Sequence, residues 1–195
     1  SEWIATPDPL PEEMRARIDQ LKRNGRFLVG YAGAHGLANA LDYLIEAAKL
    51  TQDAPVTYVF VGQGPEKPAL QARAVELGLS NVEFLPPIAK SQIPALIGEM
   101  HAMFIGWRRK AIYRFGISPN KLMDYMMAGK PVIHSIEAGN DMVAESGCGV
   151  SVPPESPSAI ADALTRMTAM SVEQRQSMGA RGRDFVLAHH DYRIL

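Results

Sequence analysis

Residues 27–48, FLVGYAGAHGLANALDYLIEAA, contain the pattern that decides the fold. The run 27–32 is apolar without a break, the run 33–36 is rich in glycine, and apolar residues then recur at helical spacing up to Ala48. An unbroken apolar run is typical of a strand that is buried on both faces, and the later spacing is typical of an amphipathic helix. The stretch therefore predicts a strand, a glycine turn and a helix.

The same unit recurs along the chain. Apolar, β-branched runs predict further strands at 56–61, 82–85, 102–107, 131–134 and 150–152. Polar segments with apolar periodicity predict helices at 11–23, 66–77, 91–100, 120–128, 156–168 and 172–189. Alternating strands and helices of these lengths predict an α/β fold with a doubly wound, Rossmann-like parallel sheet. Because such sheets bind ligands beyond the carboxyl ends of their strands, the expected site lies in the turns 33–36, 62–65, 85–88 and 108–121.

Composition narrows the possible functions. The 195 residues include 20 Lys and Arg against 21 Asp and Glu, so the chain lacks the basic excess of a nucleic-acid partner. The single Cys148 excludes a disulfide framework, and the absence of an apolar run of about 18 residues argues for a cytoplasmic protein. Charge is nevertheless concentrated in residues 108–130, which hold six basic residues and one acid. That segment either binds an anion or is a solvated loop.

The glycine turns allow two interpretations. Gly33 and Gly36, like Gly62 and Gly64, flank turns that enter helices, where a phosphate can approach backbone N–H groups. Tight turns also use glycine for purely structural reasons. Neither turn is a dinucleotide fingerprint or a Walker A loop, so phosphoryl transfer by the Walker route is excluded. His35, within the first turn, is either a donor to a ligand or an ordinary surface histidine.

Residues 115–133, FGISPNKLMDYMMAGKPVI, are the most informative stretch. Ser118 and Pro119 suit the N-cap and first position of a helix, and Gly129 suits its exit. Lys121 in the first turn is electrostatically unfavourable unless an anion lies nearby.

The acid of this stretch is also well placed. Asp124 follows Lys121 by three residues and Asn120 by four, so the three share one helix face. A carboxylate there can bind a vicinal diol such as a ribose while Lys121 and the helix N-terminus face a phosphate. A surface ion pair between Lys121 and Asp124 is the alternative.

The order of these motifs resembles the C-terminal, nucleotide-sugar-binding domain of a GT-B glycosyltransferase of family 4, the retaining enzymes of lipopolysaccharide, capsule and related glycan synthesis. Four segments after the opening strand and helix carry the resemblance: VFVGQGPE at 59–66, NVEFL at 81–85, AGKPVI at 128–133 and GCGVSVPP at 147–154. The SPNK sequence at 118–121 is similar to a subgroup of aminosugar or fucosamine transferases of surface-polysaccharide synthesis.

The resemblance implies a donor site for a UDP- or GDP-sugar, with no metal or other cofactor required. The donor-binding residues that it implies are Gly33, His35, Gly36, Gly62, Gly64, Leu85, Ile88, Ser118, Asn120, Lys121 and Asp124. The family often has two glutamates here. Asp124 stands at the second, and the first has no clear acidic counterpart, its position falling at either Tyr113 or Gly116.

The sequence departs from the family in its cations as well. The Arg and Lys that many relatives place in the first glycine loop are absent from residues 34–39. We therefore expect Lys121 to neutralise the departing diphosphate, assisted by Arg114 or Arg109, and we assign Lys121 and Arg114 as the catalytic residues.

The resemblance also sets the expected domain organisation. Residues 1–25 are expected to form an interdomain linker and connector helix, and residues 26–195 the nucleotide-sugar-binding domain. The resemblance implies an N-terminal domain that binds the glycan or lipid-linked acceptor, and we expect this domain to be absent from this chain. We therefore expect weak donor binding and no hexosyl or aminosugar transfer by the chain alone. The resemblance places the full enzyme in the cytoplasm, peripheral to the inner membrane face.

Two alternatives from other classes remain open. A nucleotide-sugar 2-epimerase-like isomerase has the same architecture and would act on the donor without an acceptor. The other alternative is a non-catalytic nucleotide-binding α/β module. Absence of binding to UDP, GDP and ADP would favour a non-catalytic module over a transferase domain.

Overall fold

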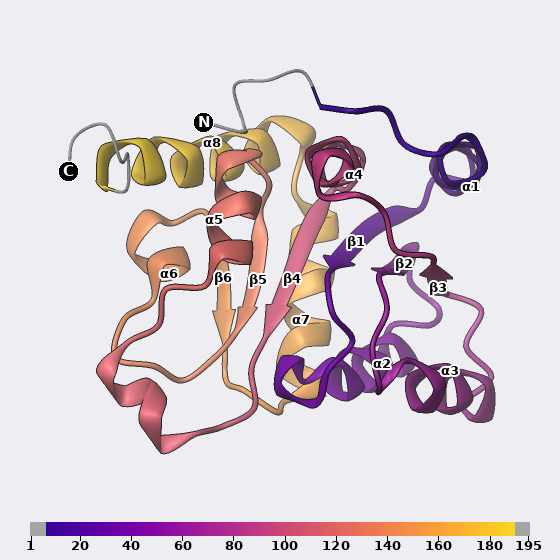
Figure 1. Cartoon of the computed structure of the whole chain (residues 1–195), viewed down its shortest axis with the longest axis horizontal. Helices are drawn as coiled ribbons and strands as arrows, with labels where there is room; N and C mark the ends of the chain where they lie inside the picture. Colours follow the sequence, from indigo (N-terminus) through magenta and orange to yellow (C-terminus); the bar gives the residue numbers. More distant parts are fainter. Residues whose placement is uncertain (1–6, 190–195) are drawn as a thin grey trace.

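Six strands form one parallel sheet in the computed structural model, which describes residues 7–189 (Figure 1). The strands are β1 (Phe27–Ala32), β2 (Val56–Val61), β3 (Val82–Leu85), β4 (Ala102–Gly106), β5 (Val132–Ser135) and β6 (Gly149–Val152). Their order in the sheet is β3-β2-β1-β4-β5-β6. The chain thus builds outward from β1 to one edge, returns to the centre and builds to the other edge, which confirms the doubly wound fold.

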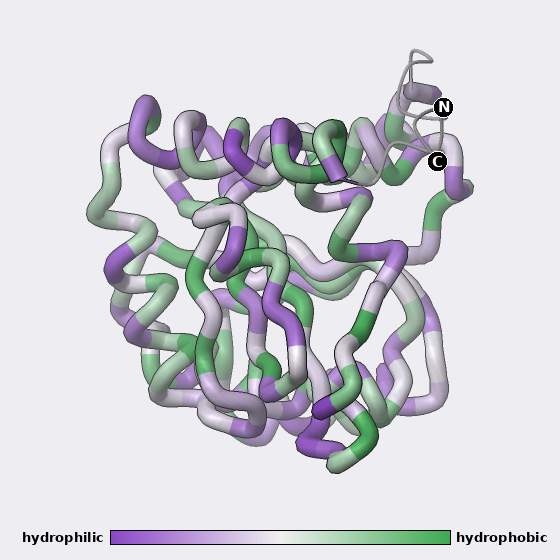
Figure 2. The backbone as a smooth tube through the Cα atoms, turned by 90° about the vertical axis from the view of Figure 1, so that its left-hand side faces the viewer, coloured by the Kyte–Doolittle hydropathy of each residue, from purple (hydrophilic) through white to green (hydrophobic). Residues whose placement is uncertain are grey.

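Helices cover both faces of the sheet because the central strands are apolar on both. Every residue of β1 and β2 is buried. One face packs against α1 (Glu12–Arg23), α4 (Ile93–Glu99), α5 (Asn120–Met127), α6 (Met142–Ser146) and α8 (Val172–His189). The other face packs against α2 (Leu41–Leu50), α3 (Lys67–Glu76) and α7 (Pro157–Ala169). Figure 2 shows hydrophobic and hydrophilic residues alternating along the helices, as expected when one side of each is buried.

The start of α5 differs from the expectation for Ser118. The helix begins at Asn120, and Pro119 occupies the N-cap with extended backbone angles and no side-chain capping bond. The Pro119 carbonyl accepts hydrogen bonds from the N–H groups of Leu122 (3.0 Å) and Met123 (3.4 Å). Ser118 therefore lies one residue before the N-cap position. No side chain at the N-cap accepts a hydrogen bond from the first N–H groups of α5. The exit at Gly129 is confirmed, since its φ of 65° is the left-handed conformation of a helix terminus.

Helix α6 is not among the helices that the sequence pattern predicts. The Asp141 carboxylate caps this helix by accepting hydrogen bonds from the N–H groups of Val143 (3.1 Å) and Ala144 (3.2 Å), and Gly147 ends it at a φ of 65°. A helix of five residues is too short to show apolar periodicity, so the only sequence signals were its capping residues.

The N-terminal helix packs on the sheet, through Met14, Ile18 and Leu21 of α1. The role of residues 1–25 as a linker between two domains stays a prediction. No helix in the described part of the chain is both long and apolar enough to cross a membrane.

Helix α5 lies against α8 through a backbone contact (Figure 1). A Cβ at Gly179 of α8 would lie 1.9 Å from the carbonyl oxygen of Gly129, directly after α5. Only glycine allows this approach, so the position of α5, and with it the N-terminus of α5, depends on a residue far from the carboxyl edge of the sheet.

We expect Gly179→Ala to lower the free energy of unfolding by about 1–3 kcal/mol, because the new methyl group forces α5 and α8 apart. Gly98→Ala is the matched control, since Gly98 also lies in a helix but nothing apart from its chain neighbours and its own helix backbone lies within 4 Å of the place that its Cβ would take. Alanine is the better helix former, so the control should be neutral or stabilising by up to about 1 kcal/mol. Urea unfolding of both variants measures the difference, and equal stabilities would contradict the packing argument.

Candidate functional site

The first two glycine turns lie backbone against backbone at the carboxyl ends of β1 and β2. The Gly33 N–H donates to the Val61 carbonyl (2.9 Å), and the His35 N–H donates to the Gln63 carbonyl (2.9 Å). A Cβ at Gly62 would lie 2.0 Å from the Gly33 carbonyl oxygen. A Cβ at Gly64 would lie 2.4 Å from the carbonyl oxygen of His35. Structural need is therefore sufficient to explain Gly62 and Gly64, whatever ligand the turns bind.

Lys121 reaches from α5 to the first glycine turn. Its Nζ donates to the Tyr31 hydroxyl (2.7 Å) and lies 4.2 Å from the centre of the Tyr31 ring. A Cβ at Gly33 would lie 2.8 Å from the same Nζ, so the ammonium group occupies the space that a side chain there would fill. Burial lowers the pKa of Lys121 to about 8. The structure thus places a cation against a turn whose own sequence, residues 33–36, has no lysine or arginine.

Two tyrosines that the sequence analysis did not single out hold this end of β1. The buried Tyr31 hydroxyl donates to the Ala34 carbonyl (2.7 Å), and burial raises the pKa of Tyr31, so the hydroxyl stays protonated. The hydroxyl of Tyr125, on α5, accepts a hydrogen bond from the Ala32 N–H (3.2 Å). A tyrosine at the end of an otherwise apolar strand was the one available signal for Tyr31.

The interpretation of His35 as an ordinary surface histidine is wrong. The side chain is buried, packed among the rings of Tyr31, Phe60 and Phe84, and neither ring nitrogen has a hydrogen-bond partner. Burial lowers the pKa of His35 to about 4, and the charges of Lys67 and Lys121 act in the same direction. The ring is therefore a neutral imidazole inside the protein, and a role as a ligand donor stays a prediction.

The remaining turn residues come together beside these glycines. Lys67 donates from its Nζ to the carbonyl oxygens of Gly62 (2.8 Å) and Leu85 (3.1 Å), which ties the ends of β2 and β3 to each other. The Leu85 side chain is buried, and Ile88 packs half-buried against the core. Gly36 has extended backbone angles and precedes the short 3₁₀ helix η2 (Leu37–Asn39).

Two of the cations in the basic loop are engaged with acids. Arg108 forms an ion pair with Asp42 (2.8 Å) and also donates to the Leu37 carbonyl (3.0 Å). Arg109 forms an ion pair with Glu137 (2.7 Å). Arg108 and Arg109 thus have acidic partners within the protein, and assistance to Lys121 by Arg109 stays a prediction.

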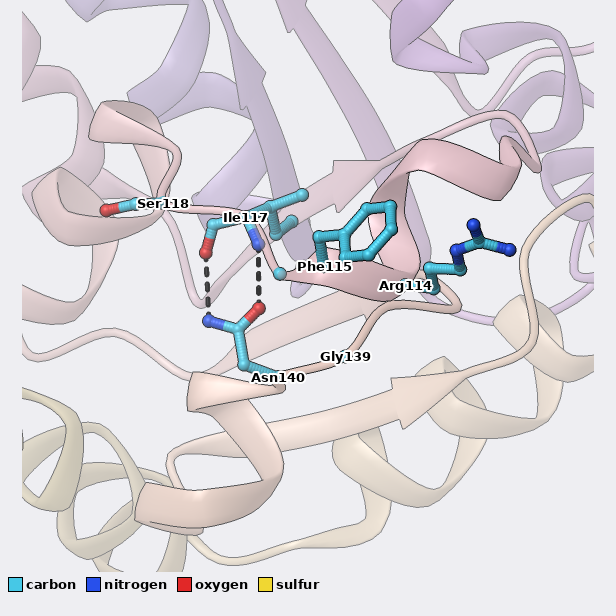
Figure 3. Close-up of a pocket in the computed structure, with 7 residues that line it drawn as sticks. Arg114, Phe115, Ile117, Ser118, Gly139 and Asn140 are labelled. Atoms are coloured by element: carbon cyan, nitrogen blue, oxygen red, sulfur yellow. Dashed lines mark hydrogen bonds between the residues drawn. The ribbon is translucent and has the colours of Figure 1, made fainter.

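Arg114 and Ser118 line a hollow of about 460 Å³ at the same edge of the sheet. Its other lining residues are Phe115, Gly116, Ile117, Gly139 and Asn140. Arg114 is exposed and stacks on the Phe115 ring, with 4.7 Å from its Cζ to the ring centre. Figure 3 shows the Arg114 side chain extending away from the backbone of 115–118, while the Asn140 amide faces Ile117.

The other two residues of the predicted helix face lie at the start of α5. Asn120 is exposed at the first position of the helix, and Asp124 is half-buried one turn later. The three residues therefore share the start of α5, and Lys121 reaches from there to the first glycine turn. Among the described residues, no group of three or more His, Cys, Asp or Glu side chains is arranged to hold a metal ion.

Comparison with known proteins agrees with this fold. The model of the family described as glycosyl transferases group 1 matches residues 26–169. The chain belongs to this family. Its sheet is that of a Rossmann-like GT-B glycosyltransferase domain, as the sequence motifs indicated.

Two relatives in the family come from bacteria. The chain is 34% identical over 173 residues to the D-rhamnosyltransferase WbpZ of Pseudomonas aeruginosa PAO1, covering 88% of this chain and 43% of WbpZ. It is 30% identical over 155 residues to WcaI of Escherichia coli K12, a glycosyl transferase assigned to colanic acid biosynthesis, covering 76% of this chain and 37% of WcaI. The chain thus spans less than half the length of both relatives.

Solved structures share the fold at lower identity. HepE of Anabaena, solved in complex with UDP and glucose, superposes with a TM-score of 0.73 and 20% identity over 93% of this chain and 49% of HepE. The C-terminal domain of a group 1 glycosyl transferase (LpcC) from Francisella tularensis superposes with a TM-score of 0.71 and 21% identity over 94% of this chain and 95% of that domain. Neither structure assigns this chain to the fucosamine-transferase subgroup, which stays a prediction.

The neutral His35 makes stability depend on pH. Its folded pKa of about 4 lies below the ordinary value of 6.5, so between these values the unfolded chain binds a proton that the folded chain does not. We expect the free energy of unfolding to fall from pH 7 to pH 5, with roughly 1–2 kcal/mol of the loss due to His35.

His35→Leu should remove that share, while the contribution of His101, whose pKa is also about 4, remains in both proteins. Urea unfolding at pH 7 and pH 5 measures both losses. An equal loss in the variant and the wild-type chain would contradict the burial of a neutral His35.

Proposed function

We propose that this chain binds a nucleoside diphosphate sugar as the donor domain of a glycosyltransferase in surface-polysaccharide synthesis, with the diphosphate at the start of α5. The observation that carries the proposal is the position of the Lys121 ammonium group, which lies against Gly33 at the carboxyl end of β1. Family relatives often place cations within this glycine loop, and here a cation reaches it from another element. The family match supports a nucleotide-sugar donor as the ligand, and the position of Lys121 supports the start of α5 as the place where its diphosphate binds.

Three features favour a diphosphate there. The N–H groups of the first turn of α5 have no side-chain cap, because Pro119 holds the N-cap position. The positive end of the helix dipole adds to the charge of Lys121. Lys121 itself is partly desolvated, which strengthens its attraction for an anion.

From the diphosphate, the nucleoside extends to one side and the sugar to the other. Asp124, one turn into α5, accepts hydrogen bonds from the ribose diol, and the loop from Leu85 to Ile88 lies against the base. The hollow beside Ser118 receives the sugar, with Arg114 at its wall. The assignment of the base and ribose follows the family resemblance, and the assignment of the sugar follows the position of the hollow.

The chemistry follows from the charges. Departure of the nucleoside diphosphate leaves negative charge on the leaving group, and fixed cations stabilise that charge in the transition state. Lys121 and the N-terminus of α5 supply this positive charge in the proposal, with Arg114 as the second catalytic cation, and no metal ion is part of the mechanism.

The finer assignments extend beyond this chain. A separate N-terminal domain would bind a glycan or lipid-linked acceptor, and residues 1–25 would link the two domains. Hexosyl or aminosugar transfer in a fucosamine-type subgroup, inactivity of the chain alone, and cytoplasmic location at the inner membrane face all belong to this proposal. The transferase family match gives no support to an isomerase, and so we propose none.

Calorimetric titration with UDP and GDP tests the proposal. We expect Lys121→Met and Asp124→Asn each to weaken binding of the preferred nucleotide by about 10–100-fold, because each removes a charged hydrogen bond of roughly 1–3 kcal/mol. Lys110→Met is the matched control, since Lys110 is an exposed lysine of the same basic loop. Its affinity should stay within about twofold of wild type, as expected of an exposed charge.

Several outcomes would overturn the proposal. If the wild-type chain bound neither nucleotide, the donor-domain assignment would be wrong. If binding occurred but both variants bound as tightly as the wild-type chain, the donor would lie elsewhere on the molecule.

Nucleotide affinity should also depend on pH through Lys121. Because the pKa of Lys121 is about 8, the lysine loses its charge as pH rises through that value, and affinity should fall between pH 7 and pH 9. In Lys121→Met the affinity should be almost constant over this range. Calorimetry at both pH values measures the difference, and a parallel fall in the variant would assign the effect to another group.

A further inference from the structure

The loop between β5 and α6 lies along the segment that leads into α5. The Gly139 N–H donates to the Tyr113 carbonyl (2.9 Å), and a Cβ at Gly139 would lie 2.2 Å from the Arg114 carbonyl oxygen. The Asn140 side chain then bonds the backbone of Ile117 twice (Figure 3). Its Oδ1 accepts from the Ile117 N–H (2.7 Å), and its Nδ2 donates to the Ile117 carbonyl (2.9 Å).

This double hydrogen bond requires an amide. A primary amide presents one acceptor and two donors in one plane, so it satisfies the N–H and the carbonyl of one residue as a neighbouring strand would. A carboxylate retains the acceptor but places a second oxygen against the Ile117 carbonyl. An alanine provides neither group.

Asn140 is itself held from the sheet side. The adjacent Asp141 carboxylate accepts from the N–H groups of Val143 and Ala144 at the start of α6. The same oxygen lies 2.9 Å from Nδ1 of His134, a buried residue of β5. Burial would raise the pKa of Asp141, but the His134 contact and the Ala144 N–H hold it at about 2, so the cap stays charged. A continuous set of contacts therefore runs from β5 through Asp141 and Asn140 to Ile117.

The segment before α5 has large apolar side chains that are exposed to solvent. Residues 111–115 form the short 3₁₀ helix η4 (Ala111–Phe115), in which Ile112 and Phe115 are 64% and 75% exposed. Gly116 has a φ of 98°, a conformation that restricts this position to glycine. Ser118 and the first residues of α5 follow directly.

We propose that Asn140 is a positioning residue of the donor site, which acts through Ile117 and sets the place of Ser118 and the N-terminus of α5. The inference rests on the proposed function, because it assigns the donor to that helix start. Asn140 pre-organises the segment, so less conformational entropy is lost when the nucleotide binds.

Asn140→Ala tests this in the whole chain by calorimetry with UDP and GDP. We expect the preferred nucleotide to bind about tenfold more weakly, as the loss of an ordered loop conformation implies. Asn81→Ala is the matched control, since Asn81 is a buried asparagine whose Nδ2 donates to the Ala48 carbonyl (2.9 Å) just before the amino end of β3. Its variant loses stability without losing affinity.

Asn140→Asp supplies a signature that a merely structural residue would not give. At pH 7 the carboxylate repels the Ile117 carbonyl, so binding should be at least as weak as in Asn140→Ala. A protonated carboxyl group both donates and accepts, as the amide does, and its population rises as the pH falls, so the affinity of N140D relative to that of N140A should rise from pH 7 to pH 5. The ratio of the two affinities at each pH removes the effects that pH has on the nucleotide and on the rest of the chain.

Hydrogen exchange gives a readout without nucleotide. The Ile117 N–H should exchange about tenfold faster in N140A than in the wild-type chain, since it loses the hydrogen bond to the Asn140 Oδ1 that protects it. In N140D its acceptor remains, so exchange should be slower than in N140A.

The outcomes separate the two proposals. If the wild-type chain and N140A bound the nucleotide with equal affinity, the positioning role would be wrong and the donor site would remain. The same conclusion would follow if N140A bound more weakly but the ratio of the N140D and N140A affinities did not change with pH. An Ile117 N–H that exchanges equally in all three chains would also overturn it. Absence of nucleotide binding in the wild-type chain would overturn the proposed function, and this inference with it.

Discussion

The candidate site depends on the missing side chains of two glycines, Gly33 and Gly62. A Cβ at Gly62 would lie 2.0 Å from the Gly33 carbonyl oxygen, and the Lys121 ammonium occupies the space where a side chain of Gly33 would lie. A larger residue at Gly62 would therefore separate the ends of β1 and β2, and a larger residue at Gly33 would displace the lysine. The close approach at these two positions brings together two strand ends and the helix that supplies the cation.

Other contacts of α5 hold that helix in position beside the first glycine turn. Tyr125 bonds the backbone of Ala32 from the middle of the helix, and the Gly179 backbone approaches its exit at Gly129. The Asn140 amide holds the segment before its first residue. Because each of these contacts comes from a different element, the position of Lys121 reflects the packing of the whole α5 face of the sheet.

The sequence predicted the fold well because its signals are local. Unbroken apolar runs mark the buried strands, and the glycines at 33 and 129 mark where elements end. Prediction was weaker where the answer depends on distant residues. Ser118 has the composition of an N-cap, but Pro119 takes that position, and His35 lies in a glycine turn, but its ring is buried among aromatic residues from three strands. Helix α6 was missed because five residues are too few to show a period.

The sequence by itself determined the alternation of strands and helices, the parallel sheet and the family, since hydrophobic periodicity and short motifs are properties of neighbouring residues. Only the tertiary structure decided which of the basic residues face the first glycine turn. Arg108 and Arg109 are bound to Asp42 and Glu137, whereas Lys121 donates to Tyr31, ninety positions away in the chain. The pairing of charges depends on distances in space, and these are fixed only when the sheet has formed and the helices have packed on it.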